Sequence, residues 1–401
     1  MSGRETDFIQ KAIDGNWAVP MGPDVNAFEK ELQAFLRTDR PVVALSSGTA
    51  AIHLALVALG VGPGDEVLCQ SMTFSASANP VTYVGATPVF IDSEPTTWNM
   101  DPDLLRHAII DRISRTGRKP AAIVMVHLYG MPSRIDRLMA IAREFSIPVV
   151  EDAAEAFGSE FNGQMCGTFG DFGVLSFNGN KMITTSGGGA LVCPDAETAR
   201  RVMFFATQAR EGYPYYQHEH IGYNYRLSNI SACIGRGQMT VLDSHLAHHR
   251  RVAAIYADLF ASEPRISVHL NPSVEYNANF WLSTILLDSQ VRVKGRDKAY
   301  GSTVSGAIGG AAGVTHSASN PHTDCEPDAD IEAMRAALAE ANIESRPLWK
   351  PMHRQPVFSS APAYVNGVSE RLFRRGLCLP SGPDITPADQ LRIASLILSL
   401  L

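Results

Sequence analysis

The chain has 401 residues, of which 45% are hydrophobic, so it is long enough for two or three domains and can fill their cores. A formal net charge of −7 excludes a protein that attracts nucleic acid through its overall field, so a phosphate-bearing ligand needs a local pocket. Residues 50–62 are too short for a membrane span of roughly 20 apolar residues, and residues 1–17 have no apolar signal-peptide core. We expect a folded protein of the cytosol that binds neither nucleic acid nor membrane.

Short apolar runs alternate with helical patterns from residue 41 onward, which is typical of βα units and a largely parallel sheet. Strands are predicted within residues 41–45, 62–70, 86–92, 119–130, 147–153, 172–177 and 187–193. Helices are predicted at residues 50–59, 75–85, 133–145 and 196–206. The fold class is therefore α/β.

The pattern changes after GYNYRLSN, residues 222–229, where the apolar spacing of residues 230–260 predicts long helices that link two domains. We place a large domain at residues 1–240 and a small C-terminal domain at residues 241–401. The small domain is predicted to contain one strand and two helices, at residues 279–288, at residues 330–341 and from residue 387. Residues 301–321 are rich in Gly, Ser, Ala and Thr, which predicts a mobile surface excursion.

Cysteine spacing points to a reducing compartment and away from metal. The six cysteines lie far apart without a C-x-x-C pair, which argues against a disulfide framework and a zinc site. His218 and His220 lie close together in QHEHIGYNYR, but two loop histidines without further ligands do not make a metal site. We therefore expect no metal. The cysteines are Cys69, Cys166, Cys193, Cys233, Cys325 and Cys378.

One lysine, Lys181, stands in SFNGNKMITTSGGGALV between the tight-turn pair Asn178-Gly179 and three glycines, residues 187–189. Glycines allow backbone to approach a bulky ligand closely. An amine held against a flat ligand can form a Schiff base. Most lysines are solvated surface groups, but this setting favours a catalytic amine.

A carboxylate follows the apolar strand in VVEDAAEAFG, where Asp152 lies at the end at which α/β sheets bind ligands. Two interpretations are open: a helix N-cap, or the partner of a pyridine nitrogen in pyridoxal phosphate. The turn SSGT, residues 46–49, offers N–H groups at a helix start, where a phosphate binds. Phe74 follows another strand and either packs in the core or lies flat on a ring. An amine, a carboxylate, a phosphate cradle and an aromatic ring together suit one cofactor.

These features closely resemble the nucleotide-sugar aminotransferases of the DegT/DnrJ/EryC1/StrS family. The resemblance runs from about residue 15 to the C-terminus, through SSGTAAIHLAL, GPGDEV, TFSASAN, GATPVFID, VEDAAEAFG, SFNGNKMITTSGGGALV, GYNYRLSN and SRPLWKPMH. It implies the type I fold of pyridoxal phosphate-dependent aminotransferases. That fold has a large domain with a mostly parallel seven-stranded sheet flanked by helices, and a smaller C-terminal α/β domain. The forms NGNK and RPLWKPMHRQPVF look most like the branch acting on UDP-4-keto-6-deoxy-N-acetylhexosamines.

The resemblance assigns cofactor roles to named residues. It implies that Lys181 forms the Schiff base with pyridoxal 5'-phosphate, that Asp152 pairs with the ring nitrogen and that Phe74 stacks on the ring. Glu155 stands near the ring hydroxyl, at a position that is often Gln in relatives. As an anion beside a phenolate, Glu155 would need a proton or a neighbouring donor, so its role is open.

The phosphate and the second subunit follow from the same resemblance. Gly48, Thr49 and Ser176 fall where the family holds the phosphate. Asn224, in GYNYR, matches an asparagine that reaches the phosphate of the other subunit, which implies a homodimer with shared active sites.

Cations for the nucleotide diphosphate must be gathered locally in a net-negative chain. SRPLWKPMHR supplies charged and aromatic candidates, namely Arg346, Trp349, Lys350, His353 and Arg354. Arg226 either neutralises the carboxylate of the amino donor or forms a structural ion pair.

One departure from the family is an insertion at about residues 291–326, where relatives have a short link. Its opening VRVKGRDKAY is either a solvated edge strand or a diphosphate contact, through Arg292, Lys294, Arg296 and Lys298.

By resemblance, the expected reaction moves an amino group from L-glutamate to a nucleotide-linked keto sugar, at C4 of a UDP-linked N-acetylhexosamine. Amination at C3 of a dTDP- or GDP-keto-sugar is an alternative, and a cofactor-binding regulator without activity is another. Sugar dehydratases of the same fold carry histidine in place of the lysine, so Lys181 argues against that class.

Overall fold

An eight-stranded sheet organises the large N-terminal part of the chain in this computed structural model, which describes residues 1–297 and 325–401. The strand order is β1-β9-β8-β5-β4-β2-β3-β14. Strands from β8 to β14 in this order are parallel, whereas β9 is antiparallel to both β1 and β8. The bounds are β1 Val42–Leu45, β2 Glu66–Gln70, β3 Thr87–Ile91, β4 Ala122–Val126, β5 Val149–Asp152, β8 Phe172–Ser176, β9 Gly189–Val192 and β14 Ala363–Tyr364. The predicted mostly parallel sheet is confirmed, and β14 adds an eighth strand from the C-terminal part.

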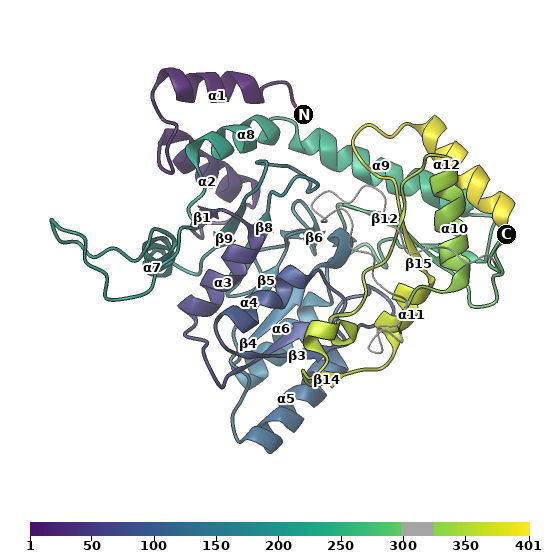
Figure 1. The fold of residues 1–401 in the computed structure, drawn as a ribbon, viewed down its shortest axis with the longest axis horizontal. Helices are drawn as coiled ribbons and strands as arrows, with labels where there is room; N and C mark the ends of the chain where they lie inside the picture. Colours follow the sequence, from purple (N-terminus) through teal and green to yellow (C-terminus); the bar gives the residue numbers. More distant parts are fainter. Residues whose placement is uncertain (298–324) are drawn as a thin grey trace.

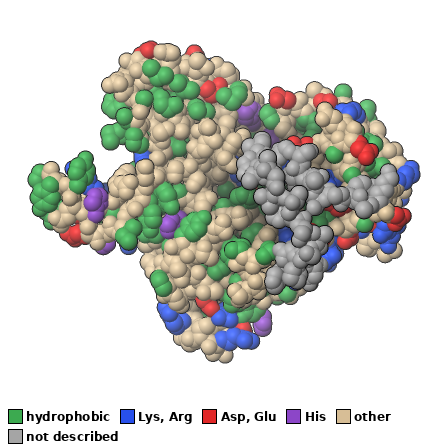
Figure 2. Space-filling model, in the orientation of Figure 1, with side chains coloured by type: hydrophobic (Ala, Val, Ile, Leu, Met, Phe, Trp, Pro, Cys, Tyr) green, Lys and Arg blue, Asp and Glu red, His purple; other side chains and the backbone are tan. Residues whose placement is uncertain are grey.

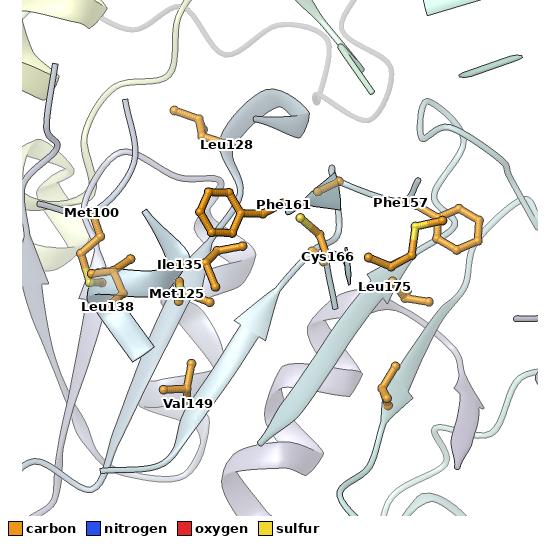
Figure 3. Packing of buried hydrophobic residues seen from close by; sticks show 14 of the residues in the cluster. Met100, Met125, Leu128, Ile135, Leu138, Val149, Phe157, Phe161, Cys166 and Leu175 are labelled. Atoms are coloured by element: carbon orange, nitrogen blue, oxygen red, sulfur yellow. The ribbon is translucent and has the colours of Figure 1, made fainter. Parts of the chain in front are cut away.

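Helices cover both faces of this sheet, as Figure 1 shows, and its central strand β4 is accordingly apolar along its whole length. Residues at alternate positions face opposite cores: Leu68 and Met125 belong to one buried cluster, whereas Cys69 and Val124 belong to the other. Figure 3 shows the first cluster between β4, β5 and α6. The helices packed on the sheet are α2 Pro23–Phe35, α3 Gly48–Ala58, α4 Asn79–Tyr83, α5 Pro102–Thr116, α6 Ile135–Phe145 and α7 Ala196–Ala206.

The predicted helix at residues 75–85 is divided in the structure. Residues Ser75–Ser77 form a single 3₁₀ turn, and α4 begins at Asn79. Pro80 stands at the start of α4, where its missing N–H costs no hydrogen bond, so it favours a new helix start there.

A four-stranded antiparallel sheet, ordered β10-β12-β15-β13, forms the centre of the C-terminal part. Its core includes Tyr256, Ile285 and Leu377, between the sheet and the helices that cover it. The elements are β10 Ile266–Val268, β12 Ser283–Leu287, β13 Arg346–Pro347, β15 Gly376–Leu379, α10 Ala329–Glu340, α11 Val368–Arg375 and α12 Pro387–Leu400. The predicted small α/β unit is therefore present.

Two long helices join the two parts, as predicted for residues 230–260. They are α8 Asn229–Met239 and α9 Leu242–Phe260, and Figure 1 shows α9 running toward the C-terminal elements. The predicted boundary at residue 240 falls in the break between them and stays a prediction. A small sheet also crosses it, because β11 Tyr276–Asn277 pairs with β6 Glu160–Phe161, which pairs with β7 Gln164–Met165. The N-terminal helix α1 Glu5–Asp14 packs on α8, and none of the described helices could cross a bilayer.

The start of the predicted insertion forms turns, so the edge strand predicted there is wrong for residues 291–297. Val291 and Val293 are buried in the core of the C-terminal part, which fixes the segment against that core. Arg292 and Arg296 lie 3.9 and 3.7 Å from the carboxylate of Asp330. Lys298 and the predicted mobile excursion at 301–321 lie outside the described residues.

The carboxyl end of β5 is fixed by a buried network around Glu151. Its Oε1 accepts hydrogen bonds from Nε2 of His127, at 2.9 Å, and from the N–H of Gly167, at 2.5 Å. Its Oε2 accepts from the N–H groups of Phe169 and Gly170, at 2.7 and 2.9 Å. Burial raises the pKa of Glu151, but His127 and the backbone N–H groups lower it more, so the pKa falls below its ordinary value.

Potential metal-ligand atoms of His127, Glu151 and Cys166 lie within 4.8 Å of one another. Both nitrogens of His127 are already engaged, because Nδ1 accepts the N–H of Ser133 at 3.0 Å and Nε2 donates to Glu151. The network is therefore structural, and it ties β4, β5 and the 167–170 turn together.

Replacing Glu151 with alanine should lower the free energy of unfolding by about 3–5 kcal/mol, because four buried donors lose their acceptor. The depressed pKa means that this stabilisation is present above the unfolded value of 4.5 and is lost as the pH falls below it. Urea unfolding at about pH 7 and about pH 4 measures both effects. Glu197→Ala, at an exposed position on α7, is the control, and equal stability of the two variants would contradict the role of the network.

Candidate active site

A pocket of about 1140 Å³ opens at the carboxyl ends of β5 and β8, between the large sheet and the C-terminal part. Typical small-molecule pockets measure roughly 300–1000 Å³, so this one has room for more than a single compact ligand. It is lined by all but one of the predicted cofactor residues, namely Gly48, Thr49, Phe74, Asp152, Glu155, Ser176 and Lys181.

Lys181 lies in the turn after β8, and its backbone N–H donates to the carbonyl of Asn178 at 3.0 Å. Its Nζ is 3.3 Å from Oε1 of Glu155 and 3.9 Å from the centre of the Trp281 ring. The side chain is only 11% exposed. The amine is therefore held inside the pocket, between a carboxyl group and an aromatic face.

Asp152 is the last residue of β5 and presents its carboxylate to the same pocket. Its Oδ2 accepts a hydrogen bond from Oγ of Ser77 at 2.6 Å, and its Oδ1 accepts the N–H of Ala154 at 3.2 Å. The helix N-cap interpretation is wrong, because β5 leads into turns and then β6. The carboxylate is left directed at whatever occupies the pocket.

Glu155 links these two groups, since it interacts with the charges of both Lys181 and Asp152. Burial raises the pKa of Glu155 to about 7, although the positive charge of Lys181 and the N–H of Tyr129 oppose this rise. The Tyr129 N–H donates to Oε2 at 2.7 Å. Near neutral pH the carboxyl therefore carries a proton in much of the population, which supplies the donor that a neighbouring phenolate would require.

The N-terminus of α3 closes another side of the pocket. Ser47 caps the helix by accepting the N–H of Ala50 at 3.0 Å, and Gly48 and Thr49 follow at the positive end of the helix. A Cβ on Gly48 would lie 3.2 Å from Cβ of Ser176, so β8 and α3 approach closely there. A Cβ on Gly189 would lie 2.4 Å from the backbone of Ser47, so this glycine serves chain packing.

Aromatic rings form the outer wall. Phe74 is 56% exposed, so the core-packing interpretation is wrong for it, and its ring centre lies 5.5 Å from that of Trp349. The ring centre of Trp349 also lies 5.0 Å from that of Tyr129, and the Tyr129 hydroxyl accepts a hydrogen bond from the backbone N–H of Trp349 at 2.9 Å. A planar ligand can pack against this exposed ring.

The basic segment that begins in β13, residues 346–354, is divided between the pocket and the surrounding scaffold. Arg346 lines the pocket and pairs with the exposed Glu344 at 2.7 Å. Lys350 lies 3.3 Å from Glu326 and is outside the pocket lining. Nδ1 of His353 is hydrogen-bonded to Oγ of Ser71 at 2.6 Å, and its Nε2 lies 3.2 Å from Oε1 of Glu370. His353 is also outside the pocket lining. Arg354 pairs with the same Glu370 at 3.3 Å.

Two predicted residues of the GYNYR segment lie away from this pocket. Arg226 donates to the carboxylate of Glu29 and to the carbonyl of Ala44, in the arrangement of a structural ion pair. Asn224 is exposed between Tyr223 and Tyr225, whose rings stack at 5.0 Å. Within one chain, neither side chain reaches the pocket.

Sequence reasoning missed Trp281 and Asn279. Both fall within residues 279–288, where apolar residues predicted only a strand. No spacing signal marked them, because their partners Lys181 and Glu155 are about a hundred residues away in the sequence.

Pyridoxal phosphate fits these groups. The pocket combines a buried carboxylate, a primary amine, a helix N-terminus with small residues and an exposed aromatic ring. Asp152 would hold the ring nitrogen, Lys181 the aldehyde carbon, Gly48, Thr49 and Ser176 the phosphate, and Phe74 a ring face.

Comparison with known proteins agrees with this chemistry. The sequence profile of the DegT/DnrJ/EryC1/StrS aminotransferase family matches residues 1–312 and 315–398. The "Putative pyridoxal phosphate-dependent aminotransferase EpsN" of Bacillus subtilis (strain 168) is 42% identical, over 100% of this chain and 94% of that protein. A GDP-perosamine synthase of Escherichia coli O157:H7 is 33% identical, over 96% of this chain and 92% of its own length.

A solved structure has the same fold. It is a DegT DnrJ EryC1 StrS aminotransferase from Brucella abortus, with a TM-score of 0.83 and 28% identity. The match covers 99% of this chain and 95% of that one.

The raised pKa of Glu155 has a measurable consequence for the cofactor-free protein. A carboxyl whose pKa rises from 4.5 to about 7 on folding stabilises the protein below pH 4.5, and this stabilisation is lost as the pH rises through 7. Glu155→Gln is neutral at every pH. Between about pH 5.5 and about pH 8, wild type should therefore lose about 2 kcal/mol of unfolding free energy relative to Glu155→Gln. Urea unfolding at the two pH values measures this difference, and a constant difference would contradict the raised pKa.

Proposed function

Because the chain belongs to the DegT/DnrJ/EryC1/StrS aminotransferase family, we propose that it transfers the amino group of L-glutamate to C4 of a UDP-linked 4-keto-6-deoxy-N-acetylhexosamine. The chain is a pyridoxal phosphate-dependent nucleotide-sugar aminotransferase, and the proposal concerns its donor, its sugar substrate and the carbon that it aminates. The observation that carries it is the convergence of Lys181, Asp152 and Glu155 on one pocket. The aminated sugar would enter surface polysaccharide or glycan synthesis.

Bound pyridoxal phosphate supplies an electron sink that stabilises negative charge at the α-carbon of an amino donor. Lys181 moves a proton to and from this carbon with its Nζ, which requires an amine that exchanges protons near neutral pH. Glu155, 3.3 Å away, holds or releases a proton at its carboxyl as the charge of Lys181 changes. Asp152 would present its carboxyl group to the cofactor from the end of β5.

Two half-reactions share this machinery, so we expect ping-pong kinetics. In the first, L-glutamate gives up its amino group and leaves as 2-oxoglutarate. In the second, the keto sugar receives that amino group. The pocket volume supports both, because the cofactor and a sugar nucleotide must lie in it together.

The nucleotide sugar requires cations and flat surfaces from this chain. Arg346 is the predicted cation that lines the pocket, and its partner Glu344 is 75% exposed, so the guanidinium can turn to a phosphate. Trp349 offers a face for the base or sugar. We assign Lys350, His353 and Arg226 to positioning the backbone around the pocket, because each contacts a protein carboxylate instead.

We also propose a homodimer with shared active sites. Residues 207–224 form an arm that projects beside α7 in Figure 1, and Figure 2 shows hydrophobic side chains at its tip. Its exposed large hydrophobic side chains are Tyr213, Tyr215, Tyr216 and Ile221, of which Ile221 is 85% exposed. A partner subunit would bury them and receive Asn224 from the base of the arm. All six cysteines are free thiols, which supports a reducing cytosol as the place of action.

Lys181→Ala should abolish transamination, with a fall of at least about a thousandfold in kcat, because Lys181 is the one described lysine that lines the pocket. Turnover is measured by mass spectrometry on a panel of UDP-, GDP- and dTDP-linked keto sugars with L-glutamate. Lys30→Ala, at an exposed position on α2, is the control and should retain activity. Retained transamination in Lys181→Ala would defeat the assignment.

The same panel distinguishes the alternatives. Amination of a UDP-linked N-acetylhexosamine at C4 supports the proposed substrate. An amine at C3, or on a GDP- or dTDP-sugar, would replace that substrate while keeping the activity. A cofactor-binding protein that aminates none of them would be the non-catalytic regulator.

Mixing two inactive variants tests the shared site. If Asn224 serves the partner's pocket, a dimer of Lys181→Ala with Asn224→Ala contains one intact site. Random pairing after unfolding and refolding should then restore about a quarter of the wild-type activity, whereas neither variant alone is active. Failure of the mixture, with dimers present by light scattering, would place Asn224 outside the partner's site.

A further inference from the structure

If Lys181 holds the cofactor as proposed, its amine would be released and bound again in each half-reaction, so the released amine would need a defined position. In this structure the Nζ of Lys181 lies 3.9 Å from the centre of the Trp281 ring. An ammonium group over a tryptophan face is attracted by the ring quadrupole, and more strongly where water is excluded. Trp281 is only 4% exposed, which meets that condition.

The indole of Trp281 also fixes the backbone beside the lysine. Its Nε1–H donates to the carbonyl of Asn180 at 2.6 Å. On the other side of the lysine, the carbonyl of Met182 lies 3.3 Å from Nδ1 of His245 on α9. Both carbonyls that flank Lys181 are therefore held, one by the same ring that receives the amine.

Trp281 is also connected, through Asn279, to Glu155, which lies on the other side of the amine. The backbone N–H of Trp281 donates to Oδ1 of Asn279 at 2.9 Å. The side-chain amide of Asn279 donates to the carbonyls of Glu155 and Phe157 at 2.8 and 3.0 Å. Asn279 is fully buried, so this connection is shielded from water.

A second anchor comes from α9. The carbonyl of Phe280, next to Trp281, accepts a hydrogen bond from Nδ1 of His249 at 3.2 Å. Burial lowers the pKa of His249 to about 4, so the ring is neutral at physiological pH and adds no charge near the amine. The spacing of His245 and His249, four residues apart on one helix, lets α9 hold both the lysine turn and the tryptophan turn.

We propose that Trp281 is a positioning residue that holds the released amine of Lys181 as an ammonium group, opposite Glu155. The ring stabilises the charged form of the released amine, and the hydrogen bond to the Asn180 carbonyl keeps the lysine turn in place. This inference rests on the proposed role of Lys181, but its test does not use catalysis.

Labelling of the cofactor-free, full-length chain with trinitrobenzenesulfonate tests the contact, because this reagent attacks only neutral amines. Peptide mass spectrometry follows Lys181, with the exposed Lys30 as internal reference. Trp281→Leu should label Lys181 about 2- to 30-fold faster near neutral pH, the range that cation–π contacts produce. The pH at half-maximal labelling should fall as well, whereas better access alone would raise the plateau without moving this pH.

Two further variants keep the test decisive. Trp281→Phe retains a ring and should stay nearer to wild type than Trp281→Leu. Trp98→Leu removes a buried tryptophan that stacks on His269, and it should leave Lys181 unchanged. The titratable groups around the amine are retained in all variants, namely Asp152, Glu155, His245 and Cys378.

The proposal is overturned if Trp281→Leu leaves the pH of half-maximal labelling unchanged, or if Trp281→Phe is no nearer to wild type than Trp281→Leu. An equal effect of Trp98→Leu would also overturn it, because general loosening would then explain the result. The proposed function would survive each of these outcomes, since Lys181→Ala and the sugar panel test it independently.

Discussion

The approach of a buried amine to a buried carboxyl, Lys181 to Glu155 at 3.3 Å, is the contact on which the rest of the pocket depends. Burying an amine and a carboxyl group removes their hydration, and their mutual attraction offsets that cost only in good geometry. Here burial raises the pKa of Glu155 to about 7, so near neutral pH its carboxyl group can hold or release a proton at little cost. A site for proton transfer near neutral pH follows directly from that balance.

The architecture of β5 explains how such a pair is kept in place. Consecutive residues of a strand face opposite sides, so Glu151 enters the buried network of His127 and three backbone N–H groups, while Asp152 faces the pocket. Glu151 therefore anchors the end of β5, and this end presents Asp152 to the pocket. Rigid support of this kind matters because a catalytic group displaced by even 1 Å loses much of its effect.

Sequence patterns predicted the parts of the fold and site that depend on neighbours along the chain. Apolar periodicity located seven of the eight strands of the large sheet and both long helices. Turn chemistry marked Lys181 and Gly48, and the end of a predicted strand marked Asp152. The pattern of residues 279–288 indicated a strand and nothing else, so Trp281 and Asn279 were missed. Their contacts cross about a hundred residues, and only the folded chain brings them to the lysine. The edge strand at residues 291–297 was wrong because its valines pack into the core.

The charged candidates show why composition alone does not define a binding site. The sequence offered four basic residues as substrate contacts, and their partners separate them in the structure. They are Arg226, Arg346, Lys350 and His353. Arg226 is 8% exposed and its partner Glu29 is 17% exposed, so breaking that pair would strand a charge in a poorly hydrated place. Arg346 and Glu344 are 53% and 75% exposed, and pairs of this kind contribute only about 0–1 kcal/mol. A phosphate could therefore replace Glu344 at almost no cost, which supports Arg346 as a proposed contact for the nucleotide.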